Sequence, residues 1–353
     1  SSSHFSSPLP QNGSESSNGN FFKYMKIFLP FEIKDIGGTA TFAQKFSDTV
    51  RDNGIKVSDK FSLNFDTLFI IADCSLWYPI IAKLLRKKIV QRLDGVYHPA
   101  TPAGKWYPLY NLKMQIIHNF LADIVIYQSE FSKVSCEKFL GKTRAEKTTI
   151  IYNGVDKEKI PSRIITQPED PTIKLLTFAK FRRRDQIEPI IESVKLLDPK
   201  KYVLHIFGSY TENLEALFKN LPPNVIFHGK KANEELLQVL HQYDIFLFSD
   251  QSACPNSVLE AMAAGLPVVA FDRGSIPELI KSGYNGEIVP LQSDIRAFED
   301  EFPFTSSSTY KKACLAVKTV AEKLPQYSSN ARTLTQNRFS LSKMIEAYYE
   351  ILR

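Results

Sequence analysis

The stretch Cys254-Pro255-Asn256-Ser257-Val258-Leu259-Glu260-Ala261-Met262-Ala263-Ala264-Gly265-Leu266-Pro267-Val268-Val269-Ala270-Phe271 decides the fold of this chain. A loop leads into a short helix that carries a carboxylate at Glu260, and Pro267 precedes a buried strand over Val268–Phe271. A helix N-terminus at the carboxyl edge of a parallel sheet attracts phosphate, since its free N–H groups and its dipole favour an anion. A carboxylate one turn further in can accept hydrogen bonds from sugar hydroxyls. Together these features predict a nucleotide-sugar site.

The composition is that of a globular protein with room for two domains. The chain has 353 residues, and its longest apolar runs have the length of strands, far short of the ~18 residues that predict a membrane span. Its four cysteines are scattered and form no Cys-x-x-Cys pair, which argues against a disulfide framework and against a zinc site. We therefore expect a reducing, cytoplasmic environment.

The net charge of +6, from 44 basic and 38 acidic residues, is modest. The basic residues are dispersed, which argues against nucleic acid as a partner. One cluster, Lys83 with Arg86, Lys87 and Lys88, ends a helix that contains several apolar residues. Two interpretations of that helix stay open: peripheral contact with the inner face of a membrane, and a core-packed helix with a basic last turn.

Strand and helix patterns alternate in two blocks, which predicts an α/β protein with two doubly wound parallel sheets. Residues 1–23 are rich in Ser, Asn and Gly and are interpreted as a disordered tail or leftover expression sequence. We expect a first domain over 24–160, a second over 161–338, and a helix over 339–353 that caps either domain, with a return to the first domain as one option. A proline-containing linker over 157–171 joins the blocks. The expected strands are Met25–Pro30, Thr67–Asp73, Ile89–Leu93, Ile124–Tyr127, Thr149–Tyr152, Ile173–Phe178, Tyr202–Phe207, Val225–His228, Ile245–Ser249 and Val268–Phe271.

Residues 25–353 resemble GT-B fold glycosyltransferases of family 4, a retaining group that uses nucleotide-diphosphate sugars. The stretch Asn256–Pro267 carries most of this resemblance. Weaker matches follow in the expected order: Gly37-Gly38-Thr39, Gln128-Ser129-Glu130-Phe131, Tyr152-Asn153-Gly154-Val155-Asp156, and a basic stretch after the first strand of the second block. The resemblance implies two Rossmann-like domains that face an interdomain cleft, with the acceptor bound by the first and the donor by the second.

The resemblance also assigns donor-binding residues. Glu260 matches the second glutamate of the family's E-x7-E element, which holds the ribose hydroxyls, whereas the first glutamate falls at Ser252. Ser252 brings a hydroxyl but no negative charge, so the hexose part of the site departs from the pattern. The backbone N–H groups at the start of the Asn256 helix would meet the diphosphate. The candidates are Gly38, Thr39, Gly208, Ser252, Pro255, Asn256, Ser257, Val258 and Glu260.

Four residues are candidates for the catalytic step. Lys180 matches the family's phosphate-binding arginine, and Arg184, or second to it Arg183, is taken for the lysine that follows, because a strict count falls on Asp185. Fixed cations would stabilise the leaving diphosphate as it gains charge. Asp94 and then His98 are the candidates for contact with the transferred sugar, and Arg92 could pair with Asp94 or hold an acceptor phosphate. The alternative interpretation is that Asp94 lies in an ordinary turn that binds no ligand.

The sequence thus predicts a retaining transfer from a UDP- or GDP-sugar to a hydroxyl of a glycan or lipid-linked acceptor. We expect no cofactor and no metal, since no Asp-x-Asp element stands where a divalent ion would bind the diphosphate. Two alternatives remain: a GT-B sugar-nucleotide epimerase, and a non-catalytic protein that binds a sugar nucleotide or glycan. Glu278 is interpreted only as a carboxylate in a helix first turn.

Overall fold

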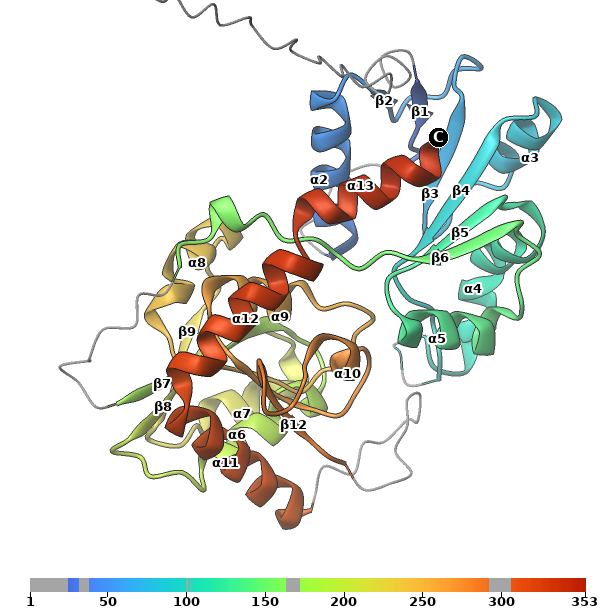
Figure 1. Cartoon of the computed structure of the whole chain (residues 1–353). Coiled ribbons are helices and arrows are strands. Elements are labelled where there is room, and N and C mark those ends of the chain that lie inside the picture. Colours follow the sequence, from blue (N-terminus) through green and yellow to red (C-terminus); the bar gives the residue numbers. More distant parts are fainter. Residues whose placement is uncertain (1–24, 32–37, 100, 102, 163–171, 292–305) are drawn as a thin grey trace, which may run out of the picture.

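The computed structural model describes residues 25–31, 38–99, 101, 103–162, 172–291 and 306–353. Two sheets of six parallel strands form the centres of two domains (Figure 1). The predicted tail over 1–23, Gly37 and most of the linker over 163–171 lie outside the described residues. The expected architecture of two doubly wound parallel sheets is confirmed.

The first sheet has the strand order β2-β1-β3-β4-β5-β6. Its central strands, β3 and β4, are buried along almost their whole length because helices cover both faces. Helices α3, α4 and α5 pack on one face, and α2 packs on the other. The strands are β1 (Lys26–Phe28), β2 (Lys56–Ser58), β3 (Thr67–Ile71), β4 (Lys88–Leu93), β5 (Ile124–Tyr127) and β6 (Lys147–Ile150). The helices are α2 (Gly38–Asp52), α3 (Trp77–Leu84), α4 (Tyr107–Ile116) and α5 (Glu130–Leu140), with a 3-10 turn η1 (Gly104–Trp106) and a π-helical turn η2 (Ile117–Leu121).

The second sheet has the order β12-β11-β10-β7-β8-β9, so the chain reverses direction across the sheet between β7 and β10. Ligands of such sheets bind outside the carboxyl ends of the strands at this switch point. The strands are β7 (Ile173–Phe181), β8 (Tyr202–Tyr210), β9 (Val225–Gly229), β10 (Ile245–Phe248), β11 (Val268–Phe271) and β12 (Gly286–Val289). The helices are α6 (Glu188–Val194), α7 (Glu215–Lys219), α8 (Asn233–Val239), α9 (Asn256–Ala264), α10 (Ile276–Leu279), α11 (Ser307–Glu322) and α12 (Leu324–Arg338). Short 3-10 turns are η3 (Lys157–Lys159), η4 (Arg184–Gln186), η5 (Glu212–Leu214) and η6 (Leu240–Gln242).

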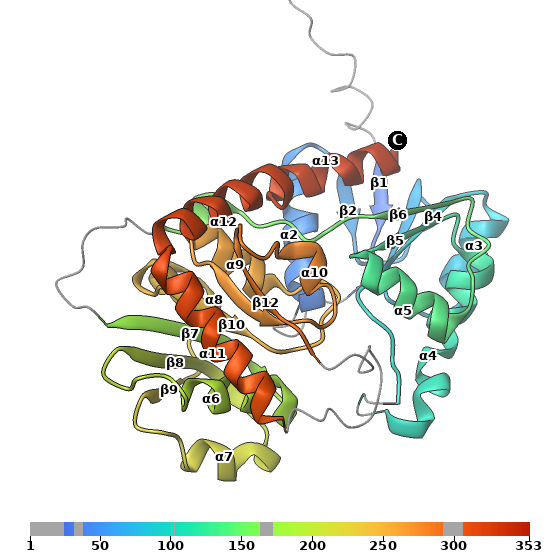
Figure 2. The same cartoon turned by 60° about the horizontal axis from the view of Figure 1, so that its bottom comes forward.

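Helix α13 (Leu341–Leu352) follows the second domain in sequence but packs in the core of the first. Met344, Ile345 and Tyr348 are buried there, and the Tyr348 ring contacts Phe42 and Phe46 of α2. Both views show α12 and α13 running from one domain to the other (Figure 2). The domains are therefore joined twice, by the segment after β6 and by the α12–α13 connection.

Several boundaries differ from the sequence-based expectation. The short edge strands β2 and β12 were not expected, because a strand of only three or four residues is too short to show an alternation of apolar and polar residues. Helix α4 changes to the π-helical turn η2 at Ile117. The helix expected from Gln186 opens as a 3-10 turn, and its α-helical part has Pro189 in the first turn, where no N–H is needed. No helix of the described residues is both long and apolar enough to pass through a bilayer.

The predicted end of a strand at Gly208 is wrong, because β8 continues to Tyr210 and pairs with β7 up to Phe181. Gly208 lies inside this pairing opposite Ala179 with a φ of 128°. A Cβ at this position would lie 1.8 Å from the Ala179 carbonyl oxygen. Glycine is thus required here by the close approach of two backbones, as elsewhere in strand interiors.

We expect Gly208→Ala to lower the free energy of unfolding by about 3 kcal/mol or more, because overpacking and a positive φ both act against it. Gly229→Ala is the matched control: its φ is 75°, but a Cβ there meets nothing within 4 Å. The control should cost only about 1–2 kcal/mol for its backbone conformation. Urea denaturation of both variants measures the difference, and equal losses would contradict this account of Gly208.

Candidate functional site

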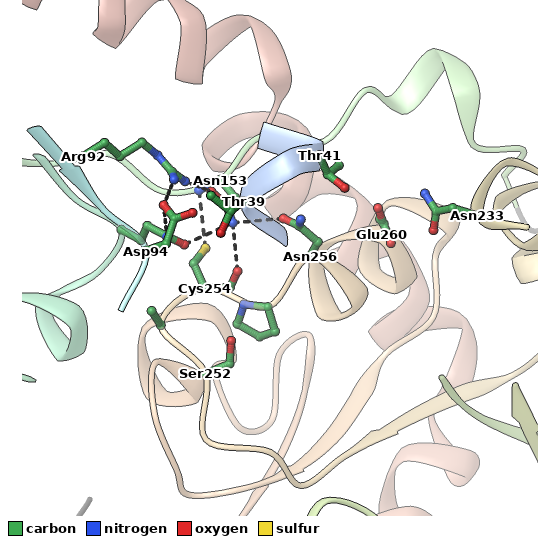
Figure 3. Close-up of a pocket in the computed structure, with 13 residues that line it drawn as sticks. Thr39, Thr41, Arg92, Asp94, Asn153, Asn233, Ser252, Cys254, Asn256 and Glu260 are labelled. Carbon is green, nitrogen blue, oxygen red and sulfur yellow. Dashed lines mark hydrogen bonds and ion pairs between the residues drawn. The ribbon is translucent and has the colours of Figure 1, made fainter. Parts of the chain in front are cut away.

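A cavity of about 330 Å³ lies between the two domains (Figure 3). The first domain contributes the start of α2 and residues after or within β4 and β5. The second contributes the loop from β10 to α9, the first turns of α9, and the start of α8. The lining residues are Thr39, Thr41, Arg92, Asp94, Gln128, Asn153, Asn233, Ser252, Ala253, Cys254, Pro255, Asn256 and Glu260. The expected cleft between the domains is therefore present.

The structure brings together six of the predicted site residues in this wall. They are Thr39, Asp94, Ser252, Pro255, Asn256 and Glu260. Sequence reasoning assigned no role to Gln128 and Asn153, although both stand in motifs that carried the resemblance. No motif in the sequence indicated a functional role for Thr41, Asn233 or Cys254, apart from the predicted site residues close to them in the chain. The predicted and the additional residues together make a wall that is mostly polar.

Two helix N-termini face this cavity. Thr39 is the second residue of α2, and Asn256 is the first residue of α9. The first N–H groups of a helix have no acceptor within the helix, and the helix dipole places partial positive charge there. Two such ends at one cavity favour an anion with oxygens on both sides, as a diphosphate has.

Glu260 is buried one turn inside α9 and lines the same cavity. Only 4% of its surface is exposed. Burial raises the pKa of the Glu260 carboxyl to about 7, against a smaller opposing effect of the Lys45 charge. A carboxyl held so near its neutral form is short of polar partners. Hydroxyl groups of a bound ligand would supply them and favour the carboxylate.

Asn153 connects the two domains at the floor of the cavity. Its side-chain Nδ2 donates to the Cys254 carbonyl at 2.9 Å and to Asn256 Oδ1 at 3.0 Å, both in the second domain. Its Oδ1 accepts from Arg92 Nη2 at 2.7 Å, and its Nδ2 also contacts Gln128 Oε1 at 3.3 Å. One amide thus fixes the first domain against the start of α9.

Arg92 is fully buried and holds Asp94 in place. Its guanidinium pairs with the Asp94 carboxylate, donates from Nε to the Tyr348 hydroxyl at 2.9 Å, and lies 3.5 Å from the centre of the Phe42 ring. Gln128 Nε2 donates to the same Asp94 oxygen at 2.8 Å. These contacts indicate that Arg92 positions Asp94, the first of the two roles that the sequence left open.

Cys254 is also buried in this network. Burial raises the pKa of its thiol to about 12, and its Sγ accepts from the Asn153 backbone N–H at 3.4 Å. A thiol with this pKa is not a nucleophile at neutral pH. Cys254 therefore has a structural role.

Glu278 makes a second contact between the domains. This residue of α10 accepts hydrogen bonds from the backbone N–H groups of Glu130 at 2.8 Å and Phe131 at 2.9 Å, at the start of α5. The Tyr152 hydroxyl donates to the same carboxylate at 2.8 Å. A carboxylate at a helix N-terminus is stabilised by the dipole. Glu278 thus does more than occupy a helix first turn, because it caps a helix of the other domain.

The predicted phosphate-binding cations are not among the residues that line the cavity. Lys180 is exposed near the end of β7, and Arg184 pairs with Glu188 one helical turn on. Arg183, the second choice after Arg184, faces the loop that forms the cavity wall, since its Nη2 lies 3.1 Å from Asp250 Oδ1. Arg183 therefore contacts this loop, whereas Arg184, the first choice, pairs with Glu188 of α6.

Asp185 stands at the position where a strict count places the family's lysine. Its carboxylate forms ion pairs with two arginines, Arg183 and Arg273. Burial alone would raise the pKa of its carboxyl, but hydrogen bonds and charges from Arg183 and Arg273 hold the pKa below its ordinary value. Arg273 Nη1 lies 2.9 Å from Asp185 Oδ2 and also donates to the Ser249 carbonyl. The cluster fixes the loops after β7, β10 and β11 against one another.

The remaining predicted residues lie outside the cavity wall. His98 is half-buried with its ring stacked on Phe139 of α5. Ser257 continues the first turn of α9, and the Val258 side chain is in the core of the second domain. Gly38 opens α2 next to Thr39. Gly208, inside β8, belongs to the sheet and not to the cavity.

Residues 172–302 match the family model described as glycosyl transferases group 1. The amylovoran biosynthesis glycosyltransferase AmsK of Erwinia amylovora is 28% identical over 159 residues, which are 41% of this chain and 39% of that protein. The sulfoquinovosyl transferase SQD2 of Arabidopsis thaliana is 31% identical over 159 residues, 42% of this chain and 30% of that protein. The chain thus spans less than half the length of either relative.

The solved structure of HepE from Anabaena in complex with UDP and glucose superposes with a TM-score of 0.67 at 18% identity. The superposition covers 93% of this chain and 99% of that protein. Together with the family match, it confirms the expected GT-B fold and the resemblance to GT-B glycosyltransferases. The assignment to family 4 stays a prediction.

We expect Glu260→Gln to change the pH dependence of stability. The folded-state pKa of about 7 lies above the ordinary 4.5, so the folded protein holds this proton more tightly and loses stability as pH rises through that interval. The glutamine has no proton to lose. We therefore compare the free energy of unfolding of the variant with that of the unmutated protein. This difference should shift in favour of the variant by about 3 kcal/mol as the pH rises from about 4 to about 8.

Urea denaturation without ligand at both pH values measures this gain. Glu350→Gln, at an exposed position of α13, is the control and should change stability little at either pH. A Glu260→Gln variant whose difference from the unmutated protein is the same at both pH values would contradict the raised pKa.

We expect Asn153→Ala to lower the free energy of unfolding by about 2–4 kcal/mol, since it leaves buried partners in both domains unpaired. Asn220→Ala, which removes one exposed hydrogen bond to the Ala216 carbonyl, is the matched control. Small-angle scattering should show a larger radius of gyration for Asn153→Ala than for the control. Unchanged stability and shape would contradict its role as the connection between the domains.

Proposed function

We propose that this protein is a glycosyltransferase that moves a sugar from a nucleotide-diphosphate sugar to a hydroxyl acceptor, with retention of configuration. The observation that carries the proposal is one interdomain cavity with two helix N-termini, a buried carboxyl at Glu260 and a held carboxylate at Asp94. The helix ends suit a diphosphate, and Glu260 suits the hydroxyls of a ribose. The names of the relatives and the family match agree with this class of reaction.

A uridine nucleotide is our first choice of donor, since the HepE structure holds UDP and glucose in the same fold. The GDP-sugars remain the second choice. Ser252 stands in the wall where the family pattern has a glutamate. It can exchange one hydrogen bond with a sugar hydroxyl but adds no charge, so we propose a neutral contact on that side of the hexose.

In the proposed front-face step, the bond from the anomeric carbon to the β-phosphate oxygen breaks as the acceptor oxygen bonds to the same face of that carbon. The electron pair leaves with the phosphate oxygen, and that oxygen takes the acceptor's proton. Asp94 would stabilise the positive charge that develops on the sugar, and the helix N-termini would stabilise the leaving diphosphate. Lys180 and Arg183 are proposed to add to that stabilisation. No metal has a part in this proposal.

The proposal is tested by the transfer rate and donor affinity of two variants. Asp94→Asn should lower kcat by about 10- to 100-fold, the effect of one lost charged interaction in the transition state, with little change in donor Kd. Glu260→Gln should weaken donor binding by about tenfold or more. Calorimetry with UDP-sugars and GDP-sugars gives Kd, and the release of nucleoside diphosphate with a panel of glycan and lipid-linked acceptors gives kcat.

Glu350→Gln serves as the control and should leave both quantities unchanged. Tight donor binding without transfer to any acceptor would assign the non-catalytic function instead. Mass spectrometry that finds an isomerised donor in the absence of acceptor would assign the epimerase. An Asp94→Asn variant with the original kcat would overturn the role of Asp94.

A further inference from the structure

Exposed apolar side chains are concentrated on one side of the first domain. Of the fifteen large apolar side chains that are exposed among the described residues, twelve fall within 63–134 and only three in the second domain. Helices α3 and α4 carry six of them, and Leu85 and Trp106 adjoin these helices. Both views place these helices on the side of the first domain that is turned away from the second domain (Figures 1 and 2).

Helix α3 has an apolar stripe that faces solvent. Trp77, Ile80 and Leu84 are spaced by three and four residues, so they share one face of the helix, and Leu84 is 78% exposed. The opposite face is also apolar, because Pro79 and Ala82 are buried against the sheet. Burial in the core therefore explains only one of the two apolar faces of α3.

A second stripe follows on η1 and α4. Trp106, Leu109 and Tyr110 occupy one face, and Trp106 and Leu109 are 61% and 66% exposed. Met114 faces the sheet and is buried in its core. We name the two solvent-facing stripes together the outer helical face. An apolar surface of this kind on a folded protein marks a binding site for an apolar partner.

The outer helical face is also basic. Residues 77–147 contain twelve lysines and arginines and five acidic residues, a net charge of +7, whereas the whole chain has +6. Lys83 and Arg86 are exposed on either side of Leu84, and the Lys105 amine lies 5.7 Å from the centre of the Trp106 ring. Lys83 also pairs with Asp123, so Arg86 and Lys105 are the exposed cations beside the two stripes, in a stretch of the sequence with a net positive charge.

We propose that the outer helical face docks on the surface of an anionic lipid bilayer. Helices with leucine and tryptophan on one face and cations along the border lie at such interfaces, with the apolar side chains among the acyl chains. A second copy of this chain would bring two positive faces together, and a nucleic acid would leave Ile80, Leu84 and Leu109 in water. Only an anionic lipid surface fits both the charge and the apolar side chains.

The test is sedimentation with vesicles of phosphatidylcholine alone and of phosphatidylcholine mixed with phosphatidylglycerol. The unmutated protein should sediment with the mixed vesicles, less so as salt is raised, and only weakly with the neutral ones. The double variant Trp106→Ser/Leu109→Ser should bind the mixed vesicles about tenfold more weakly or worse, since two apolar anchors are lost. Leu315→Ser, at an exposed leucine of α11 in the second domain, is the control and should bind as before.

Equal sedimentation with both kinds of vesicle, or with neither, would overturn the proposal. A double variant that still binds like the control would also overturn it. Sedimentation velocity that shows the unmutated protein dimeric and the double variant monomeric would assign the face to self-association instead. Nucleotide-sugar binding by the double variant should be unchanged, so that the outcome is independent of the proposed transferase activity.

Discussion

The hydrogen bonds of one buried amide, that of Asn153, set the distance between the two domains and so the shape of the cavity between them. This side chain reaches Arg92 in the first domain and the Cys254 carbonyl and Asn256 in the second. A buried polar group has a large cost when it loses its partners, so the arrangement is stable only while both domains stay in place. The contact of Glu278 with the start of α5 fixes the same closed arrangement from another direction.

The chemistry of the cavity follows from burial and from helix ends more than from exposed charges. Burial of Glu260 raises the pKa of its carboxyl, and the N-termini of α2 and α9 supply partial positive charge without a cationic side chain. Asp94 keeps its position because Arg92 and Gln128 hold it. Such fixed groups can stabilise charge that develops in a reaction without a cost of reorganisation.

Sequence reasoning predicted the parts of this structure that depend on local pattern. The strand β11 has the expected bounds, and the helix α9 lies where a short helix was expected, because small residues, Pro267 and a continuous apolar run leave few alternatives. Glu260 was predicted at the cavity because it matches the second glutamate of the family's element, and Asp94 because it ends a strand at the edge that the resemblance places beside the sugar. The edge strand β2 and the π-helical turn at Ile117 were not, since their stability comes from neighbours in space.

The same distinction explains why some of the predicted residues lie outside the cavity wall. The sequence shows that Arg182, Arg183 and Arg184 are basic, but the acidic partner of each depends on tertiary contacts, such as Asp250 for Arg183 and Glu188 for Arg184. The sequence does not reveal that a Cβ at Gly208 would lie 1.8 Å from the Ala179 carbonyl oxygen, or that the Tyr348 hydroxyl accepts a hydrogen bond from Arg92. Long-range contacts between polar groups leave no periodic signal in one sequence.

The most direct test of the central claim is a crystal structure of the protein with a UDP-sugar bound. We predict density for the diphosphate at the N-terminus of α9, for the ribose hydroxyls at Glu260, and for the sugar between Asp94 and Ser252. A nucleotide bound outside the interdomain cavity, or bound there with its ribose away from Glu260, would contradict the account.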